Sequence, residues 1–444
     1  MPSKKQTQRV AVLADSDTRW KWGALTAQRI VAAEGSASGD ETDIRLDGYL
    51  LRGRATPTAR QLSEVGVRAD VLREVTGVEF LGEMERARER YDVVVLALVG
   101  GAVQAMLHGL ANVWADRPER PVVVTGYVGV VYEKLADGLL LRHGADVVLA
   151  NSRQDAERFR AVYEGVGADA GAVTECALPF LGGAPRTAPN DPYTVCFAAQ
   201  PSVPESRADR TYLLKRMIRH AKLHPEREVL IKLRSKPGEH TTHIEELPYQ
   251  KLAKGHELPA NCRLVYGHMG EVLDRTDLLV TVSSTAALEA LHRRIPTAVL
   301  TDLGVREALG NHHFTGSGCL ASWTELDEGY VPVPDERWLA RQGVAADGAY
   351  ETAFDEARAR LDELAAKPGL PPLAPYYTLT TAPGYLPGIL ARHHLAPDGR
   401  PLPGAQAAAK EPGPVRQIVR QAARGAYRHG VQRVAPVIRR MGEL

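Results

Sequence analysis

The sequence predicts an α/β protein made of two doubly wound domains with a basic tail behind them. Two series of short apolar runs alternate with helical patterns, and a segment rich in Gly, Pro and Ala at 181–192 separates the two series. A length of 444 residues suits two or three domains, and a hydrophobic content of 44% is enough to fill their cores. We therefore expect two Rossmann-like domains that face each other across a cleft.

The first domain is predicted over residues 1–182. Its strands are the apolar runs at 10–14, 44–51, 93–98, 122–125 and 147–149. Asn151 and Ser152 then cap a helix that ends near Gly165. Helices between successive strands favour a mostly parallel sheet, in which ligands bind at the carboxyl ends of the strands.

The second domain is predicted over residues 193–366, where the same alternation begins again. Its strands are expected at 194–198, 229–233, 262–266, 278–282 and 297–300, with helices at 210–224 and 350–366. Two such domains joined by a hinge bring the carboxyl ends of their strands to one cleft, which is the expected active site.

Two further segments follow the second domain. Residues 367–414 are rich in proline and lack periodicity, which predicts a connector. In 415–444 apolar residues recur at helical spacing beside a stripe of arginines: Arg416, Arg420, Arg424 and Arg428. Such a basic amphipathic helix suits an anionic membrane surface, and a helix packed on the protein or a disordered tail are the alternatives.

Composition excludes several classes of protein. A formal net charge of +1 gives no reason to expect a nucleic-acid partner. The N-terminus is polar and no apolar run is long enough to cross a bilayer, so we expect a cytoplasmic protein that is at most peripheral at the inner membrane face. The four cysteines lie far apart without a CxxC pair, which argues against a zinc site or a disulfide framework.

The sequence Ser283-Ser284-Thr285 leaves the strand at 278–282 and enters a helical pattern. Hydroxyl groups and free backbone N–H groups at such a turn form an anion site, although serine and threonine are also ordinary N-caps. Glu289 lies one helical turn after Thr285. It is not at the capping-box position, whether Ser284 or Thr285 is the N-cap. A phosphate with a second polar group beside it, as in a sugar nucleotide, fits this pattern.

Other polar residues follow strands of the second domain. Lys232, Arg234 and Lys236 form a basic strand end that suits a phosphate, or else a solvated edge. Gln200 and His268 also follow strands of this domain and are further candidates for binding a sugar nucleotide at the cleft. His313 lies in a glycine-containing loop near the expected cleft, and with no acidic residue or cysteine at ligand spacing we expect no metal there.

Asp15 and Asp17 follow the first strand and are candidates for a general base that takes a proton from a substrate hydroxyl. The alternative is that they only form a turn or cap a helix. Trp20 and Trp22 behind them suit stacking on a sugar face or walling the cleft. Three residues after later strands are expected at the same cleft, where glycines allow close approach of a ligand or form tight turns: Gly100, Gly101 and Tyr127.

The two Rossmann-like halves, the Ser283–Thr285 turn and the run from Glu289 to Pro296 resemble glycosyltransferases of the GT-B architecture. The turn is similar to that of bacterial sialyltransferase-like and capsule-polymer enzymes, and most of the chain resembles uncharacterised glycosyltransferases of high-GC Gram-positive bacteria. This resemblance implies transfer of a sugar from a nucleotide donor to a cell-wall or capsular glycan, without a cofactor or bound metal.

Several residue roles follow from the resemblance. Ser283, Ser284 and Thr285 would contact the donor phosphate, and Glu289 would accept hydrogen bonds from ribose. In sialyltransferase-like families a histidine precedes the proline that corresponds to Pro237, whereas this chain has Lys236 there. Lysine keeps a positive charge for the phosphate but not a titrating imidazole, which His240 or His243 would then supply.

Three other functions use the same residues. Asp15-Ser16-Asp17-Thr18 matches the DxDxT opening of haloacid-dehalogenase-like phosphatases, but their later acidic motif is missing. A sugar-nucleotide epimerase and a non-catalytic binding protein share the two-domain architecture. The base, the sugar, the acceptor and the stereochemical outcome are not specified by the sequence.

Overall fold

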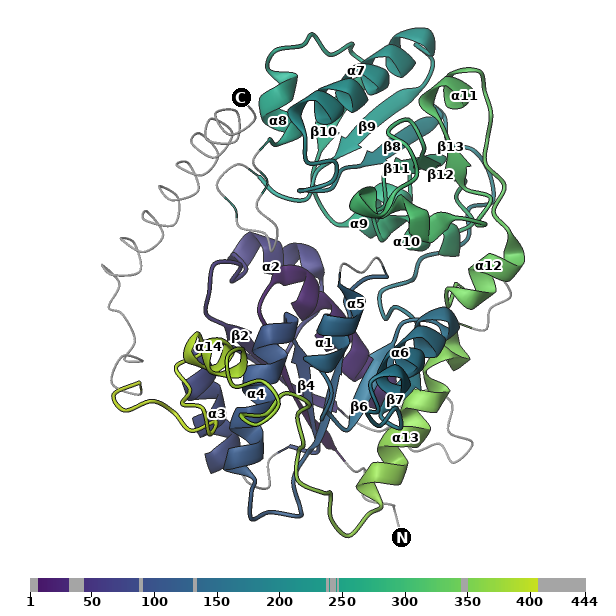
Figure 1. Ribbon diagram of the computed structural model, residues 1–444. Coiled ribbons are helices and arrows are strands. Elements are labelled where there is room, and N and C mark those ends of the chain that lie inside the picture. Colours follow the sequence, from purple (N-terminus) through teal and green to yellow (C-terminus); the bar gives the residue numbers. More distant parts are fainter. Residues whose placement is uncertain are drawn as a thin grey trace. The chain divides into compact units, whose positions relative to one another are not determined.

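The computed structural model describes residues 7–31, 44–87, 91–130, 134–236, 239, 245, 247–344 and 350–405. These residues form two compact units, which are described separately (Figure 1). Unit 1 contains residues 7–180, 341–343 and 350–405, and unit 2 contains residues 181–340 and 344. Each unit is built on one sheet, as the sequence predicts.

The sheet of unit 1 has seven parallel strands in the order β3-β2-β1-β4-β5-β6-β7. The strands are β1 (Gln8–Ala14), β2 (Ile44–Leu51), β3 (Val71–Val75), β4 (Val93–Ala97), β5 (Val122–Gly126), β6 (Val147–Ala150) and β7 (Val173–Glu175). All five strands expected from apolar runs are present. The two edge strands are not predicted from the sequence, because β3 is mostly exposed and β7 has only three residues.

Several helices of unit 1 begin at side-chain caps. Thr58 and Thr76 form capping boxes, and the Ser152 hydroxyl accepts the Asp155 backbone N–H at 3.1 Å. The helices that follow the strands are α1 (Asp17–Val31), α2 (Ala59–Val65), α3 (Gly77–Arg86), α4 (Gly100–Val113), α5 (Leu135–Leu140) and α6 (Arg153–Gly165).

Unit 2 has a six-stranded parallel sheet in the order β10-β9-β8-β11-β12-β13. Its strands are β8 (Thr194–Ala198), β9 (Glu228–Lys232), β10 (Cys262–Val265), β11 (Leu278–Thr281), β12 (Thr297–Leu300) and β13 (Leu320–Ala321). Its helices are α7 (Arg207–Leu223), α8 (Tyr249–Ala253), α9 (Met269–Leu273), α10 (Ala286–His292), α11 (Trp323–Asp327) and most of α12 (Glu336–Arg341), with 3-10 turns η1 (Glu307–Leu309) and η2 (Asn311–Phe314).

The chain returns to unit 1 after residue 344, which differs from the predicted domain boundary at 366. A 3-10 turn, η3 (Glu351–Phe354), leads into α13 (Asp355–Ala365), which contacts α1 and β7 (Figure 1). Arg358 donates to the Arg29 backbone oxygen at 2.8 Å. These contacts place the helix expected at 350–366 in unit 1 rather than in the second domain.

The predicted connector at 367–414 is also part of unit 1 as far as it is described. It carries α14 (Leu386–Ala391), which packs against α4 (Figure 1). Five of its apolar side chains are buried in the core of unit 1: Leu373, Leu386, Ile389, Leu390 and Leu395. Its prolines suppress regular structure, but the leucines between them bury apolar surface, which is a stabilising contribution.

The predicted tail at 415–444, with its arginine stripe, lies outside the described residues. Within the described part of the chain, no helix combines the length and the apolar character that spanning a membrane requires. All four cysteines are buried and free, and burial raises the pKa of each thiol.

Candidate functional site

Polar groups gather around Asp15 at the carboxyl end of the unit 1 sheet. One Asp15 oxygen accepts from Arg19 Nη1 at 2.9 Å, and the other accepts the Val99 backbone N–H at 2.9 Å. Arg19 lies in the first turn of α1 and Val99 precedes α4, so Asp15 links β1 to both helices. Asp17 begins α1, where a carboxylate stabilises the helix N-terminus.

His393 approaches this carboxyl end from the C-terminal segment. It follows α14, and a Cβ built on Gly77 would lie 3.7 Å from both the Cβ and the backbone oxygen of His393. Burial lowers the pKa of His393, while the charge of Asp15 acts in the opposite direction. The prediction of a connector at 367–414 leaves this residue out of the site, although the His393-His394 pair is a visible signal in the sequence.

Trp20 and Trp22 are both 0% exposed. The Trp20 ring packs so closely on Gly48 of β2 that a Cβ there would lie 2.6 Å from it. Trp22 packs on Gly126 in the same way, and its Nε1 donates to Asn151 Oδ1 at 3.4 Å. The prediction that these rings stack on a sugar or wall a cleft is wrong, because α1 lies against the sheet and buries both.

Two of the other candidates in unit 1, Gly100 and Tyr127, make close packing contacts, and the predicted place of all three at a cleft stays a prediction. A Cβ on Gly100 would lie 2.9 Å from the Leu141 side chain, so this glycine permits close packing at the start of α4, whereas Gly101 has no such contact. The Tyr127 ring lies 3.9 Å from the Arg142 guanidinium, and burial raises the pKa of Tyr127. These contacts hold the loops after β4 and β5 in place.

In unit 2, Ser283 and Gln200 bind each other. Gln200 Nε2 donates to the Ser283 hydroxyl at 3.1 Å, and Gln200 Oε1 accepts the Ser283 backbone N–H at 2.9 Å. The hydroxyl in turn donates to the Leu309 backbone oxygen at 2.5 Å, and Ser283 is only 4% exposed. A phosphate contact by Ser283 would break these bonds, so the structure gives both predicted donor residues an architectural role.

Ser284 and Thr285 are half-buried and begin the helical segment that contains α10. The Ser284 hydroxyl accepts the Ala286 backbone N–H at 3.2 Å, which is local capping of the kind expected of serine. Glu289 lies inside α10 and is 9% exposed. Its predicted contact with ribose stays a prediction.

The basic residues at the end of β9 differ in exposure. Lys232 is 9% exposed, and its ammonium donates to the Leu233 backbone oxygen at 2.8 Å. Arg234 is half-buried, and Lys236 is exposed with its ammonium 5.8 Å from the Tyr266 ring centroid. Arg234 and Lys236 therefore stay candidates for a phosphate, while Pro237, His240 and His243 lie outside the described residues.

The two candidate histidines of unit 2 pack against neighbours. His268 precedes α9, and a Cβ on Gly270 would lie 2.9 Å from its ring. His313 is 8% exposed, with its ring centroid 6.0 Å from that of Trp338. Among the described residues, no group of three His, Cys, Asp or Glu side chains is placed to hold a metal ion.

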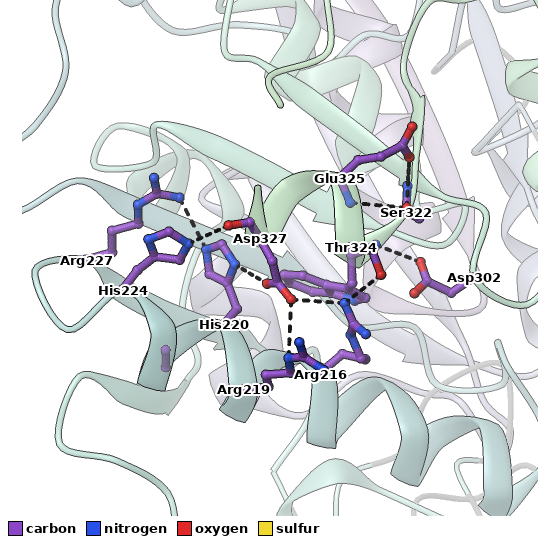
Figure 2. A network of polar contacts seen from close by, with 12 residues as sticks. Arg216, Arg219, His220, His224, Arg227, Asp302, Ser322, Thr324, Glu325 and Asp327 are labelled. Carbon is purple, nitrogen blue, oxygen red and sulfur yellow. Dashed lines mark hydrogen bonds and ion pairs between the residues drawn. The ribbon is translucent and has the colours of Figure 1, made fainter. Parts of the chain in front are cut away.

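A separate polar network joins α7 to α11 (Figure 2). Asp327 accepts from Arg216 at 3.0 Å and lies 2.8 Å from His220 Nδ1, with Arg219 at 3.7 Å. Arg227 Nη1 lies 3.4 Å from the other ring nitrogen of His220. This arrangement fits a neutral imidazole that donates to Asp327 and accepts from Arg227, and it ties two helices together.

A family model described as "Putative glycosyltransferase (DUF6716)" matches residues 10–364. The match covers both sheets, from within β1 to α13. No curated protein matches the chain.

Solved structures that are similar to this chain include a complex with UDP, a UDP-GlcNAc 2-epimerase and a glycotransferase. The Staphylococcus aureus MnaA–UDP complex is 11% identical, covers 82% of this chain and 99% of its own, and has a TM-score of 0.50. The UDP-GlcNAc 2-epimerase of Methanocaldococcus jannaschii is 12% identical over 79% of this chain and 99% of its own, with a TM-score of 0.50. The glycotransferase of kitacinnamycin is 15% identical over 81% of this chain and 96% of its own, with a TM-score of 0.41.

Proposed function

The chain belongs to the DUF6716 family of glycosyltransferases, and from this premise we propose that it transfers a sugar from a nucleotide-sugar donor to a cell-wall or capsular glycan. The family match over 10–364 is the observation that carries the proposal. Two parallel sheets with polar groups after their strands support it, since open α/β sheets bind ligands at the carboxyl ends of their strands.

We assign the donor to unit 2. Ser284, Arg234 and Lys236 offer a hydroxyl and two positive charges after β11 and β9. Positive charge and hydrogen-bond donors stabilise a nucleotide that leaves with its phosphate charge, which makes a bound metal unnecessary. Thr285 and Glu289 complete this proposed subsite, and Ser283 with Gln200 fixes the turn that carries it.

The donor is tested by thermal unfolding of the full chain with UDP-, CMP-, GDP- and CDP-linked sugars. Uridine diphosphate is the first choice because the S. aureus structure of the same fold contains UDP. We expect one nucleotide class to raise the Tm, since a ligand that binds only the folded state stabilises it by about 2.7 kcal/mol at a hundred times its Kd.

Variants locate the donor and separate the alternatives. Replacing both Arg234 and Lys236 with Gln should abolish the shift, whereas the same change at the exposed, salt-bridged Arg86 in unit 1 should preserve it. No shift with any donor would refute the proposal. Interconversion of UDP-GlcNAc with its C2 epimer would identify an epimerase, and magnesium-dependent phosphatase activity lost in Asp15→Asn would identify a phosphatase.

We further propose that residues 415–444 bind the inner face of an anionic membrane. Residues 411–444 contain seven arginines and two glutamates. Each basic side chain close to such a surface contributes about 1 kcal/mol to membrane binding. Deleting 415–444, or replacing Arg416, Arg420, Arg424 and Arg428 with Gln, should abolish sedimentation with anionic vesicles. If these variants sediment with the vesicles as strongly as the full chain does, the tail does not bind the membrane.

A further inference from the structure

Arg210 of α7 is a charged side chain in the interior of unit 2, where it is only 1% exposed. Its Nη1 donates to the backbone oxygens of Gln200, Pro201 and Pro204 at 3.0, 3.2 and 3.3 Å. All three oxygens belong to the loop that follows β8. One guanidinium nitrogen therefore ties three peptide groups of that loop to α7.

The rest of the guanidinium is fixed by residues that follow β9. Nη2 donates to Glu245 Oε1 at 2.8 Å, and the guanidinium lies 4.4 Å from the centroid of the Tyr249 ring. Glu245 is 7% exposed and Tyr249 is 0% exposed. A charge-assisted hydrogen bond and an aromatic face hold a planar guanidinium in one orientation, which the ammonium of lysine does not reproduce. Arg210 thus links the segments after β8 and β9.

Gln200 carries this link to the turn after β11, which is the next strand to β8 in the sheet. Its backbone oxygen is held by Arg210, while its side chain forms hydrogen bonds with the hydroxyl and the backbone N–H of Ser283. Ser284, the proposed phosphate contact, is the next residue. A continuous path of hydrogen bonds therefore leads from Arg210 through Gln200 to the turn that carries Ser284.

Packing of α7 on the sheet does not require a charge at position 210. The same helix already buries three apolar side chains in the core of unit 2: Leu213, Leu214 and Met217. A buried charge costs free energy unless it is paired and hydrogen-bonded, and an apolar residue of similar size often stabilises a core as well or better. The directional hydrogen bonds to the loop after β8 are what an apolar side chain does not supply.

We propose that Arg210 is a positioning residue for nucleotide binding in unit 2. It fixes Gln200, and through Gln200 it fixes Ser283, so that the hydroxyl of Ser284 is held where it meets a nucleotide phosphate. This inference rests on the proposed donor subsite in unit 2. Arg210 acts on the nucleotide only through these residues, so its loss should weaken binding while the fold is kept.

The test is the Kd of a free nucleotide for the full-length protein, measured by isothermal titration calorimetry well below the Tm of each variant. UDP is the first probe, followed by CMP, GDP and CDP if UDP does not bind to the wild type. We expect Arg210→Lys to raise the Kd by about 10- to 100-fold, the loss seen when groups that orient metal ligands are removed. Lysine keeps the positive charge but loses the planar fork.

Arg216→Lys is the matched control on the same helix. Arg216 donates to Thr324 and Asp327 at 3.2 and 3.0 Å, so its replacement also removes hydrogen bonds and an ion pair from α7. It has no part in the path to Ser283, and we expect it to keep the wild-type Kd. Equal increases of the Kd in Arg210→Lys and Arg216→Lys would reduce the effect to a general loss of stability and overturn the inference.

A double-mutant cycle with Gln200→Met tests the route. If Arg210 acts through Gln200, the variant with both changes should bind the nucleotide no more weakly than the weaker of the two single variants. Fold-changes that simply multiply would show two independent effects and would contradict this route. If Arg210→Lys does not fold, Glu245→Gln replaces it, since it keeps the guanidinium and removes the charge that holds Nη2. We then expect the Kd to rise about threefold, and an unchanged Kd overturns the inference.

Failure of this inference differs from failure of the donor subsite. A nucleotide that binds the wild type and folded Arg210→Lys with equal Kd removes only the role of Arg210. If none of the four nucleotides binds the wild type, the donor subsite in unit 2 is refuted and this inference with it.

Discussion

At the scale of single residues, the bonds of Ser283 decide between two roles for the turn after β11. Its hydroxyl and its backbone N–H both have partners inside unit 2, namely the Gln200 side chain and the Leu309 backbone oxygen in η1. Ser284 beside it is half-buried, and its hydroxyl accepts the Ala286 backbone N–H. The turn is therefore held by its first serine, and the second is the better candidate for ligand contact.

Ser283→Ala should destabilise unit 2 by about 1–3 kcal/mol, because it leaves the Leu309 oxygen and the Gln200 amide without their partner. Urea unfolding followed with a probe in unit 2 measures this loss. The matched control is Ser63→Ala, which removes an exposed hydroxyl that donates to the Arg60 backbone oxygen at 2.7 Å, and which should cost under about 0.5 kcal/mol. Equal stability of the two variants would contradict the architectural role of Ser283.

For single residues, the sequence predicts which side chains follow a strand but not which groups they form hydrogen bonds with. It places Asp15 after β1 correctly, since an apolar run followed by Asp-Ser-Asp marks a strand end. It does not predict the bond from Val99, which lies 84 residues away. Trp20 and Trp22 show the same limit: their positions in α1 are predictable, but their complete burial depends on Gly48 and on strand β5.

At the scale of elements, His220 couples α7 to α11 through Asp327 (Figure 2). Burial lowers the pKa of His220, and His224 and Arg227 act in the same direction against Asp327. Above the unfolded-state pKa of about 6.5, the folded and unfolded states are both neutral at this site. Below it the unfolded chain gains a proton that the folded chain resists, so stability falls as the pH drops from about 6.5 toward the folded-state pKa.

We expect His220→Gln to reduce the slope of unfolding free energy against pH below about 6.5 by up to about 1.4 kcal/mol per pH unit. Other histidines with lowered pKa values, such as His108 and His143, contribute to the wild-type slope, so the difference between proteins isolates His220. His312→Gln, at an exposed position of unit 2, is the control and should keep the wild-type slope. A His220→Gln slope equal to that of the control would show that His220 is protonated in both states or in neither.

Strands with buried apolar runs are predictable, and those without them are not. Ten of the strands follow from such runs, whereas β3 carries charged residues on an edge and β7 and β13 are very short. The helix at 355–365 is also predictable as a helix. Its assignment to unit 1 is not, because it depends on contacts with α1 and β7 rather than on its own sequence.

At the scale of the whole molecule, unit 2 is inserted between two parts of unit 1. Residues 7–180 supply the seven-stranded sheet, and residues 350–405 supply α13, α14 and five buried side chains of its core. Sequence order led to a division of the chain into consecutive domains with a boundary at 366. Apolar side chains spread thinly through a proline-rich stretch give no periodic signal, so the return of the chain was not predictable.

The inserted arrangement has a consequence for how the protein is made. A ribosome adds about 5–20 residues per second, and it completes residues 181–340 before it begins 350–405. The described residues of unit 2 are therefore almost all synthesised before residues 350–405, which supply the helices α13 and α14 that pack on α1 and α4 of unit 1. During that interval the apolar surface that Leu386, Ile389 and Leu390 bury in the finished protein is uncovered, and exposed apolar surface of this kind favours aggregation of a nascent chain.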